Sequence, residues 1–468
     1  MLFTTDSEEM SLAKRMLRGI SARAAMMNGM NSLRSAMILG AIVWPLLAFS
    51  QVSNAGPGAP AIAQDARPGD RAASAAIEAF HARFRAELSR HGVAGGGFAF
   101  VRGAEPAATF FQGEANTATH QPVDAETSYN WASITKTFTA IAILQLRDRG
   151  RLSLDDPAVR YVPELREVHD AYGSIDAITI RQLLTHSAGF RNPTWPWDCD
   201  DSASCDWQPF EPTHWRQVEA MLPYTHIAFQ PGSRWSYSNL GYVFLGQIVE
   251  RLSGDDIEVY IDKNILKPLG MTASYFDRSP YFLLGHVSAS YVRTGGKLAA
   301  QPFDFDTGIT AANSGLKAPI TDMVKYLRFL MGDPANPVYD IVLRRSSLEE
   351  AWNGVLPAVE AGRPPTAYTS GPSGAQPMMG LGFFVLETGG RRYIYHDGDQ
   401  AGFSSELLVD PQGHSGSVLV VNTTDSGAQA PAPEKHAKSN TEPEPSADLR
   451  MTLRGVLLEA VYPSYAKP

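Results

Sequence analysis

The amino-acid sequence predicts an α+β fold in which an antiparallel sheet is flanked by helices and a second, mainly helical lobe is inserted into the chain. Short apolar and aromatic segments bounded by turn residues occur near the beginning and again near the end, as is typical of antiparallel strands. The long region between them alternates short helical patterns with loops rich in Pro and Gly. With 468 residues, of which 44% are hydrophobic, the chain can bury such a core.

Two strands are predicted early in the chain and four late in it. "GGGFAFVRG" (95–103) and "ATFFQGEA" (108–115) form a hairpin, because each is short, aromatic and bounded by turn residues. The late segments form an antiparallel meander, because tight turns separate them. These segments are "LGFFVLE", "RRYIYHD", "SSELLVD" and "SGSVLVVN", and the turns are "TGG", "GDQAGF" and "PQGH".

Three helices are predicted around these strands. Residues 74–91 carry an apolar stripe on one face, residues 133–149 are apolar nearly all round, and a final amphipathic helix lies near 448–461. A helix that is apolar all round is buried, so 133–149 should lie in the core. Gly150 follows it as a common stop signal.

These patterns divide the chain into seven segments. We expect a targeting segment, a flexible lead-in, the first part of the α/β lobe, the mainly helical lobe, the second part of the α/β lobe, a disordered insertion and a C-terminal helix of the α/β lobe. In chain order, these segments are 1–55, 56–75, 76–152, 153–318, 319–426, 427–447 and 448–468.

The N-terminal region has the pattern of a secretory signal. Scattered basic residues precede an apolar run at 36–50, which Pro45 interrupts and small residues follow. Because the run is too short to cross a bilayer comfortably, we expect a periplasmic or secreted protein with no membrane span in its mature form. An uncleaved inner-membrane anchor is the alternative. Export also favours a disulfide between the only two cysteines, Cys199 and Cys205, over two free thiols.

Composition and motifs exclude several classes of function. The net charge is −9 and no basic patch is present, so nothing indicates nucleic-acid binding. The sequence contains no H-E-x-x-H, no Walker A loop, no dinucleotide fingerprint after a strand and no G-x-S-x-G. We therefore expect no metal and no organic cofactor, and a small-molecule or peptide substrate.

The first candidate site residues are Ser133 and Lys136, in "WASITKTFTA". Residues three apart lie on one face of a helix, and a serine at its start lies where backbone N–H groups can stabilise an oxyanion. A lysine one turn into an apolar helix would be desolvated, which lowers its pKa and makes it a usable base. The alternative is an N-cap serine beside a solvated lysine, because a Ser-x-x-Lys pair alone is a weak motif.

Tyr237 and Asn239, in "SYSNLGYVFLG", are the second candidates, at the start of another apolar helix. A tyrosine near two cationic groups can lose its proton and later return it to a leaving group. Asparagine offers a donor and an acceptor to a substrate amide or to the lysine. The alternative is a loop tyrosine that packs its ring beside an asparagine that caps the helix.

The third candidates, His396, Asp397 and Gly398, stand at a predicted strand end. A histidine there could adjust the tyrosine and the lysine or donate to the substrate, and a glycine lets the backbone approach closely. The alternative is a turn with a solvent-facing histidine.

The three motifs occur together, in a fixed order and in fitting contexts, and with them the chain resembles the serine β-lactamase-related family. This family includes class C β-lactamases, D,D-carboxypeptidases, D-aminopeptidases and family VIII-type esterases. The resemblance covers residues 76–425 and the final helix, and its supporting stretches include "RQLLTHSAGF", "KPLGMTAS" and "LGFFV".

The resemblance implies the two-lobed fold of serine β-lactamases and penicillin-binding proteins, with the active site between the lobes. It also implies that Ser133 is the acylated nucleophile, Lys136 its partner base and Tyr237 the second general acid/base. The backbone N–H groups of Ser133 and Asp399 would form the oxyanion hole. The substrate-binding residues that it implies are Asn239, His396, Asp397, Gly398 and Asp399.

The third motif departs from that of the β-lactamases proper. They carry Lys-Thr-Gly, which helps to hold a substrate carboxylate, whereas this chain has His-Asp-Gly. A histidine is at most partly charged near neutral pH, and Asp397 would repel a carboxylate if it faced the site. The resemblance therefore implies an acyl-enzyme esterase or D-peptidase rather than an efficient β-lactamase. The alternatives are a penicillin-sensor-like or non-turnover binding protein on the same fold, and a cell-wall D,D-carboxypeptidase.

Residues 191–215 form a segment rich in tryptophan and in acidic residues. We hypothesise that it shapes substrate choice with aromatic walls and an acidic rim. A packed, disulfide-linked surface loop is the alternative.

Overall fold

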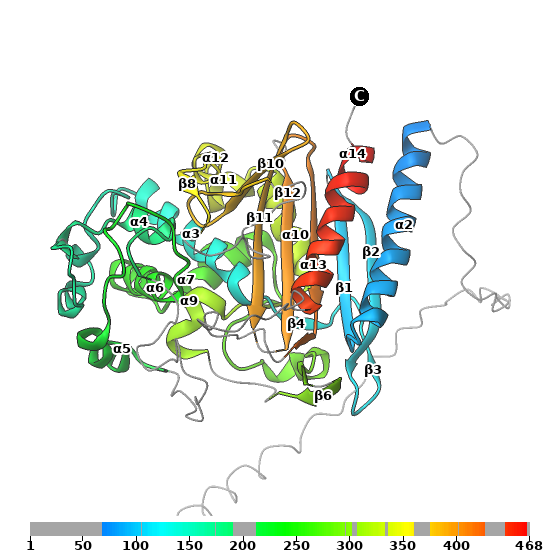
Figure 1. Ribbon diagram of the computed structural model, residues 1–468, viewed down its shortest axis with the longest axis horizontal. Helices are drawn as coiled ribbons and strands as arrows, with labels where there is room; N and C mark the ends of the chain where they lie inside the picture. The colour runs from blue at the N-terminus through cyan, green and yellow to red at the C-terminus, as the bar shows by residue number, and fades with distance from the viewer. Residues whose placement is uncertain are drawn as a thin grey trace, which may run out of the picture. The chain divides into compact units, whose positions relative to one another are not determined.

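The computed structural model describes residues 68–103, 105–173, 175–190, 212–294, 296–301, 307–332, 336–359, 375–400, 402–425 and 445–465 (Figure 1). The predicted targeting segment, both cysteines and most of the aromatic segment at 191–215 lie outside these ranges. None of the helices within them is long and apolar enough to cross a membrane.

In the described part of the chain, nine strands form one antiparallel sheet with the order β3-β2-β1-β13-β12-β11-β10-β9-β8. The early hairpin and the late meander are therefore both present, and β1 and β13 pair to join the two ends of the chain. The strands are β1 (Gly95–Arg102), β2 (Glu105–Asn116), β3 (Gln121–Pro122), β8 (Leu356–Pro357), β9 (Met378–Met379), β10 (Phe384–Thr388), β11 (Arg391–Gln400), β12 (Phe403–Asp410) and β13 (Ser415–Val421).

The predicted turn between β10 and β11 consists of two glycines. Gly389 and Gly390 have φ angles of 57° and 72°, and Thr388 pairs with Arg391 across them. Positive φ at both central residues defines a type I′ turn, whose twist matches that of the flanking strands.

The prediction that a strand ends at His396, Asp397 and Gly398 is wrong. β11 continues to Gln400, and residues 398–400 pair with residues 403–405 of β12. Gly and Asp are turn residues by local propensity, but pairing with a neighbouring strand overrides that preference. The third motif therefore lies inside a paired strand.

Both faces of the sheet are buried, because alternate residues of each strand point to opposite sides. Phe98 and Phe100 of β1 belong to one hydrophobic cluster, whereas Ala99 and Val101 belong to another. Helices α2 (Pro68–Arg90), α13 (Pro445–Val456) and α14 (Tyr462–Tyr465) cover the first face, which we call the outer face (Figure 1). Helix α10 (Ile320–Met331) packs on the other, inner face.

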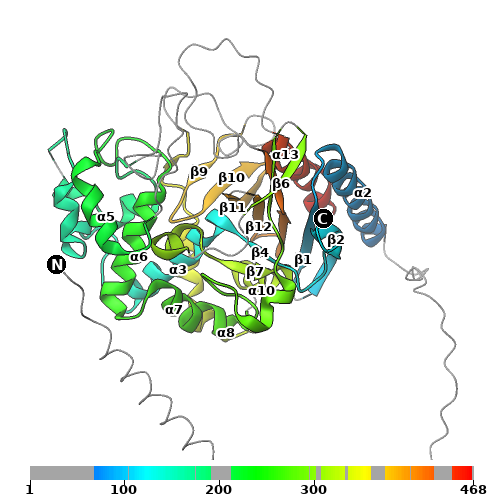
Figure 2. The ribbon, with the colours of Figure 1, turned by 90° about the horizontal axis from the view of Figure 1, so that it is seen from below.

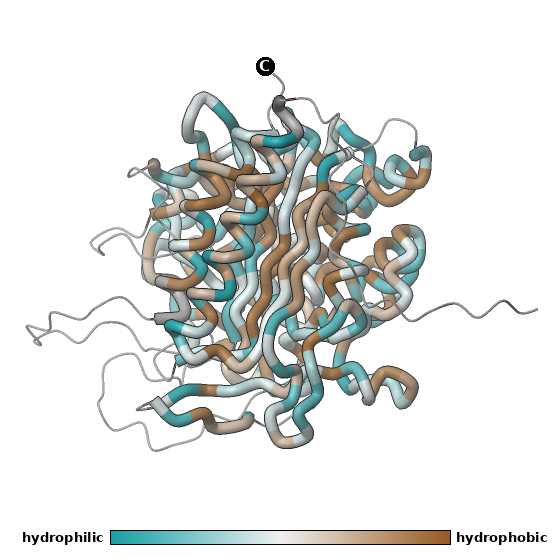
Figure 3. Tube along the Cα trace, turned by 90° about the vertical axis from the view of Figure 1, so that its right-hand side faces the viewer, coloured by the Kyte–Doolittle hydropathy of each residue, from teal (hydrophilic) through white to brown (hydrophobic). Residues whose placement is uncertain are grey.

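Figure 3 shows the molecule from the side of α2 and α13. Hydrophobic residues run along the strands in the middle, whereas the helices beside them alternate between hydrophobic and hydrophilic residues. Helices that are apolar on one side only are expected where one side faces the sheet and the other faces water.

The flexible lead-in predicted at 56–75 is wrong for residues 68–75, which belong to α2. Pro68 suits a first helical position, and the alanines that follow favour a helix. At the other end, α13 begins at Pro445, within the insertion predicted at 427–447, and continues through a π turn at Leu457–Val461 into α14.

The region predicted to be mainly helical also contains short strands. A three-stranded sheet, β14-β5-β6, includes two of its segments, and β7 pairs with β4 just before Ser133. The strands are β4 (Ser128–Asn130), β5 (Tyr291–Thr294), β6 (Lys297–Ala300), β7 (Lys317–Pro319) and β14 (Thr423–Asp425). The helices are α4 (Ile180–Leu184), α5 (Trp215–Met221), α6 (Asn239–Ser253), α7 (Ile257–Ile261), α8 (Lys267–Leu269) and α9 (Ala311–Ser314).

Helix α3 (Thr135–Asp148) lies between the sheet and the helical region, packed against α6 and α9 (Figure 2). Every residue from Thr135 to Leu146 is buried, which confirms the prediction of a core helix. Two further helices, α11 (Val338–Val342) and α12 (Arg345–Ala351), lead back towards the sheet.

Candidate active site

Ser133 lies in a turn that its surroundings hold in an unusual conformation. The preceding Ala132 has a φ of 47°, in the left-handed region that residues with a Cβ rarely adopt. Asn130 Oδ1 accepts a hydrogen bond from Ala132 N–H at 2.6 Å, and Trp131 N–H donates to Leu316 O at 2.9 Å. Backbone strain persists only where neighbouring contacts enforce it, and it is frequent at catalytic residues.

Ser133 is the only residue from 127 to 146, all of which the structure describes, that is not buried. It belongs to the 3-10 turn η1 (Ala132–Ile134), which leads directly into α3, and so lies just before the helix rather than in it. A hydroxyl that remains accessible within an otherwise buried stretch is available to react with a substrate.

Lys136 lies one turn further along and is fully buried. Its Nζ is 3.1 Å from Ser133 Oγ and donates to Asn313 O at 2.9 Å. Burial lowers the pKa of Lys136 well below its usual value, and no described carboxylate forms an ion pair with it. The structure thus places a lysine with a depressed pKa beside the accessible serine, in agreement with the predicted pair.

Tyr237 precedes α6 and reaches the same point from another part of the chain. Its hydroxyl forms a hydrogen bond with the side chain of Ser133, and Lys136 Nζ lies 5.0 Å from the centre of its ring. Burial raises the pKa of Tyr237, as do the charges of Asp399 and Asp397, whereas the bond with Ser133 lowers it. The structure therefore brings together the three residues predicted to be catalytic.

His186 is a residue of this site that the sequence interpretation missed. It follows α4, has a φ of 54°, and its ring lies 4.4 Å from that of Tyr237. Its carbonyl accepts from Ser236 N–H at 2.9 Å and its Nδ1 accepts from Ser238 N–H at 3.1 Å. His186 thus holds the residues on both sides of Tyr237. Its sequence signal is its position in "LLTHSAGF", one of the stretches in which the chain resembles the family.

Burial lowers the pKa of His186 well below its usual value, and the nearby charge of Lys136 lowers it further. The imidazole is therefore neutral near neutral pH. Because Nδ1 accepts a hydrogen bond, the proton of the neutral ring resides on Nε2.

His396 is 1% exposed, not solvent-facing, and packs 5.3 Å from the ring of Phe384. Burial and then the charge of Lys136 lower its pKa to about 4, so it too is neutral near pH 7. Its Nδ1 donates to Asp397 O at 2.6 Å, which leaves the lone pair on Nε2. That buried nitrogen has no hydrogen-bond partner among the described residues.

Gly398 lets β11 approach the turn that carries Ser133. A Cβ at this position would overlap Trp131 O and Ser405 Oγ and lie 3.3 Å from Ala132 Cβ. The close backbone approach predicted at this glycine is present, and the neighbour that it approaches is the turn of residues 131–134, which we call the nucleophile turn for the predicted role of Ser133.

The side chains of Asp397 and Asp399 do not face the substrate side. Asp397 forms an ion pair with Arg454 of α13, and Asp399 Oδ1 and Oδ2 each lie 2.8 Å from Arg450 Nη1. Because these residues alternate along β11 with His396 and Gly398, their side chains are directed towards α13. The predicted role of Asp399 concerns its backbone N–H and stays a prediction. Asp397 was expected to repel a substrate carboxylate only if its side chain faced the site, and its ion pair with Arg454 shows that it does not.

Asn239 is the first residue of α6 and is partly buried. It does not cap the helix, because Ser238 does so by accepting a hydrogen bond from Gly241 N–H. Lys136 donates to Ser133 Oγ and to the backbone oxygen of Asn313. The predicted contact of Asn239 with substrate stays a prediction.

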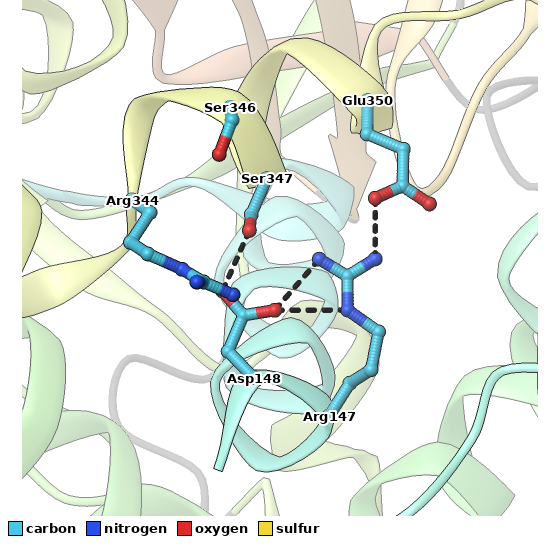
Figure 4. A pocket seen from close by; sticks show the side chains of 6 residues that line it. All are labelled: Arg147, Asp148, Arg344, Ser346, Ser347 and Glu350. Atoms are coloured by element: carbon cyan, nitrogen blue, oxygen red, sulfur yellow. Dashed lines mark hydrogen bonds and ion pairs between the residues drawn. The ribbon is translucent and has the colours of Figure 1, made fainter. Parts of the chain in front are cut away.

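Two other features bear on the nature of the site. The described residues contain no group of three His, Cys, Asp or Glu side chains that could hold a metal ion. A separate pocket at the far end of α3 is lined by charged side chains that pair with one another, Arg147 with Glu350 and Arg344 with Asp148 (Figure 4). Because its charges are mutually satisfied, this pocket joins α3 to α12 and offers no comparable chemistry.

The chain is similar in sequence to known proteins. A family model described as Beta-lactamase matches residues 76–440. Protein flp of Staphylococcus aureus (strain COL) is 25% identical over 297 residues, which are 63% of this chain and 53% of that protein. Esterase EstB of Burkholderia gladioli is 34% identical over 170 residues, 34% of this chain and 41% of EstB.

Solved structures give the same fold. The octameric penicillin-binding protein homologue from Pyrococcus abyssi superposes with a TM-score of 0.64 at 24% identity, over 82% of this chain and 78% of that one. The chain spans about half the length of the curated flp proteins that it matches. Since the family model covers most of the described residues, including every site residue above, this chain belongs to the beta-lactamase family.

Proposed function

We propose that this protein is a serine hydrolase that acts through an acyl-enzyme on an ester or an amide. The observation that carries the proposal is the environment of Ser133, which alone remains accessible in a buried stretch and lies 3.1 Å from the desolvated amine of Lys136. A neutral amine at that distance can take the hydroxyl proton. The names of family relatives, among them an esterase, support the same class of reaction.

The pKa directions assign the proton transfers. Lys136, whose pKa is lowered, takes the proton of Ser133 as Oγ bonds to the carbonyl carbon and the carbonyl oxygen becomes an oxyanion. Tyr237, whose pKa is raised, keeps its proton and gives it to the departing alcohol or amine as the C=O bond re-forms. Lys136 then returns its proton to Tyr237. A water molecule repeats the sequence on the acyl-enzyme and restores Ser133.

The backbone N–H groups of Ser133 and Asp399 are proposed to bind the oxyanion. β10 pairs with β11 only as far as Tyr395, so residues 396–400 have one edge that β10 does not cover. Gln400 and Phe403 close the β11–β12 hairpin, and hydrogen-bonded and non-hydrogen-bonded pairs alternate from there. This alternation directs the Asp399 N–H away from β12, as an oxyanion donor requires.

We propose neutral esters or amides as the substrates in preference to β-lactams. The supporting observation is His396, which burial keeps uncharged at the position where β-lactamases proper carry a lysine. A neutral imidazole contributes little attraction for a substrate carboxylate. D,D-peptidase activity requires such a carboxylate and is therefore the weaker candidate. Export to the periplasm or medium remains a proposal from the sequence pattern of residues 36–50.

Labelling with a fluorescent fluorophosphonate and a fluorescent penicillin tests the nucleophile. Wild-type protein should take up the fluorophosphonate label and Ser133→Ala should take up none. Loss of the fluorescent penicillin label over time distinguishes a hydrolase, in which water releases the acyl group, from a sensor that retains it. Wild-type protein that takes neither label would overturn the proposal.

A substrate panel then tests the preference. p-Nitrophenyl esters, D-amino-acid anilides and a chromogenic cephalosporin are compared by kcat/KM. We expect the neutral esters to be the best substrates. A cephalosporin turned over as fast as the best ester would show that His396 does not set the preference.

A further inference from the structure

The back of strand β11 carries a buried cluster of charged side chains that the proposed mechanism does not use. Asp397 and Asp399 project from β11 towards α13, on the outer face of the sheet. Arg450 and Arg454 of α13 and Glu406 of β12 complete the cluster. The arginines are each 1% exposed, and Asp397 and Glu406 are each 2% exposed.

Each arginine contacts more than one partner. Arg450 Nη1 lies 2.8 Å from both oxygens of Asp399 and 2.7 Å from Ser404 Oγ. Arg454 pairs with Asp397 and donates from Nε to Glu406 Oε2 at 2.6 Å. Arg450 Nε is 3.8 Å from Asp397 Oδ1, so the two pairs form one network.

Such a network is not explained by stability alone. Desolvating buried ions costs several kcal/mol per ion, and replacing a buried ion pair by apolar residues of similar size is often neutral or stabilising. Buried pairs are best attested as devices that fix one arrangement of neighbouring elements. We therefore ask which neighbouring elements this cluster holds in place.

The cluster stands directly behind the contact between β11 and the nucleophile turn. Gly398, between the two aspartates, packs against Trp131 and Ala132. Ser405, paired with Gly398 on β12, donates to Trp131 O at 3.1 Å. A shift of β11 would therefore move its backbone relative to Ser133.

The charges of the two aspartates also reach the site. Both raise the pKa of Tyr237, and Arg450 opposes Asp397 at His396 by lowering the pKa of that ring. The other charged or titratable groups around Tyr237 are Lys136 of α3, His186 after α4 and Tyr242 of α6. Without the arginines, two carboxylates would add negative potential where an oxyanion has to form.

We propose that Arg450 and Arg454 are positioning residues of this active site, which hold β11 against the nucleophile turn and cancel the negative charge of Asp397 and Asp399 behind it. The inference rests on the proposed serine-hydrolase function. It makes the helix at the end of the chain an electrostatic part of a site whose nucleophile lies more than 300 positions earlier.

The test compares variants in which the charge of Asp399 has lost its partner with variants in which both charges are removed or both are kept. The variants are Arg450→Met, the double variant Arg450→Met with Asp399→Asn, and Arg450→Lys, which retains the charge. Arg391→Met, with and without Asp410→Asn, is the matched control. It breaks an ion pair between β11 and β12, the strands that carry the acidic residues of the cluster, at the other end of these strands. The readout is the rate of fluorophosphonate labelling of Ser133 between pH 5 and 10, with Tm measured in parallel.

In Arg450→Met the negative charge of the unpaired Asp399 should raise the pKa of Lys136, the group proposed to take the proton of Ser133. The acid limb of the labelling rate then moves to higher pH by about one unit, and the plateau falls about tenfold or more. Neutralising Asp399 in the double variant should return the acid limb to its wild-type position. Arg450→Lys should keep the acid limb at its wild-type pH. The Arg391 controls should lower Tm and leave the acid limb at that pH.

Equal acid limbs in wild type, the single variant and the double variant would overturn the electrostatic part of the inference. An unchanged plateau in the folded single and double variants would overturn the positioning part. If Arg450→Met does not fold, the plateau of the double variant decides the positioning part. Asp399→Asn alone, which leaves the charge of Arg450 unpaired, then decides the electrostatic part, because its acid limb should move to lower pH. Failure of the wild-type protein to label would instead overturn the proposed function, so the two failures are distinguishable.

Discussion

His186 supports Tyr237 through its backbone, its ring and its Nδ1, although none of its atoms needs to touch a substrate. A misplaced catalytic group costs a large part of the rate, on the order of 100-fold for a displacement of about 1 Å. The contribution of His186 should therefore appear in the rate of acylation more than in the stability of the fold.

Replacement of His186 by Phe retains a ring but removes the acceptor for Ser238 N–H. We expect kcat to fall by about 10- to 100-fold with little change in KM. His186→Asn should recover part of the loss, because Asn offers a side-chain oxygen to that N–H and tolerates a φ of 54°. Steady-state kinetics of the best ester test this order. Equal loss in the two variants would show that the acceptor is not what matters.

His396 should make the protein sensitive to mild acid. Its pKa in the folded state is about 4, below the ordinary value of 6.5, so between these pH values the unfolded chain binds more protons than the folded one. Stability therefore rises with pH across this window and is lost on acidification, by up to about 3 kcal/mol for this residue. Buried Lys136 and His186 act in the same direction.

Urea unfolding at pH 4.5 and pH 7 measures this effect. His396→Gln should narrow the difference in the free energy of unfolding between the two pH values. His226→Asn is the control, a histidine that is exposed instead of buried, and the variant should retain most of the difference. If the free energy of unfolding of His396→Gln differs between the two pH values as much as that of the wild type, the acid sensitivity does not come from His396.

At the scale of elements, the contact between β11 and the turn η1 depends on the absence of a side chain at position 398. A Cβ there would meet backbone and a buried hydroxyl, neither of which can move without displacing β11 or η1. Gly398→Ala should lower the rate of Ser133 labelling about 100-fold and destabilise the fold by about 1–3 kcal/mol.

Gly455→Ala is the matched control for this substitution. Gly455 lies in α13, where a Cβ would meet no atom within 4 Å. It should leave labelling unchanged and stabilise the helix by up to about 1 kcal/mol. Labelling kinetics and thermal unfolding of both variants provide the comparison, and a Gly398→Ala enzyme with wild-type labelling would refute the role assigned to the close approach.

Helix α3, the early hairpin and the late meander could be predicted from the sequence because periodicity and turn residues are local signals. The extension of β11 to Gln400 could not, because it depends on pairing with β12. The direction of Asp397 follows from alternation along that strand, and its partners lie on α13, more than 50 positions away. Similarly, nothing local to His186 indicates that it supports a tyrosine at 237.

For the whole molecule, the helices at the end of the described chain are needed to bury the outer face of the sheet. Leu449, Leu453 and Leu457 are buried there, and each contributes about 1.5–3 kcal/mol. Removal of α13 would also leave Asp397 buried without Arg454, at a cost of about 3–5 kcal/mol. Together these losses approach or exceed the total stability of a typical domain, about 5–15 kcal/mol.

A chain shortened to residues 1–425 should therefore not accumulate as folded protein. A chain shortened to residues 68–468 should retain every described element and label at Ser133 like the full-length protein. Soluble yield, circular dichroism and fluorophosphonate labelling of the two truncations test this contrast. Full labelling of the 1–425 chain would show that the C-terminal helices are dispensable.

The packing of α14 against α2 has a consequence for engineering. The described chain begins with α2 and ends with α14, and these two helices lie side by side on the outer face of the sheet (Figure 1). Neighbouring termini make circular permutation feasible. A short linker from the end of α14 to the start of α2, with new ends opened between residues 426 and 444, would place α13 and α14 before α2 in the order of synthesis. The two arginines behind β11 would then precede the nucleophile on the ribosome instead of following it.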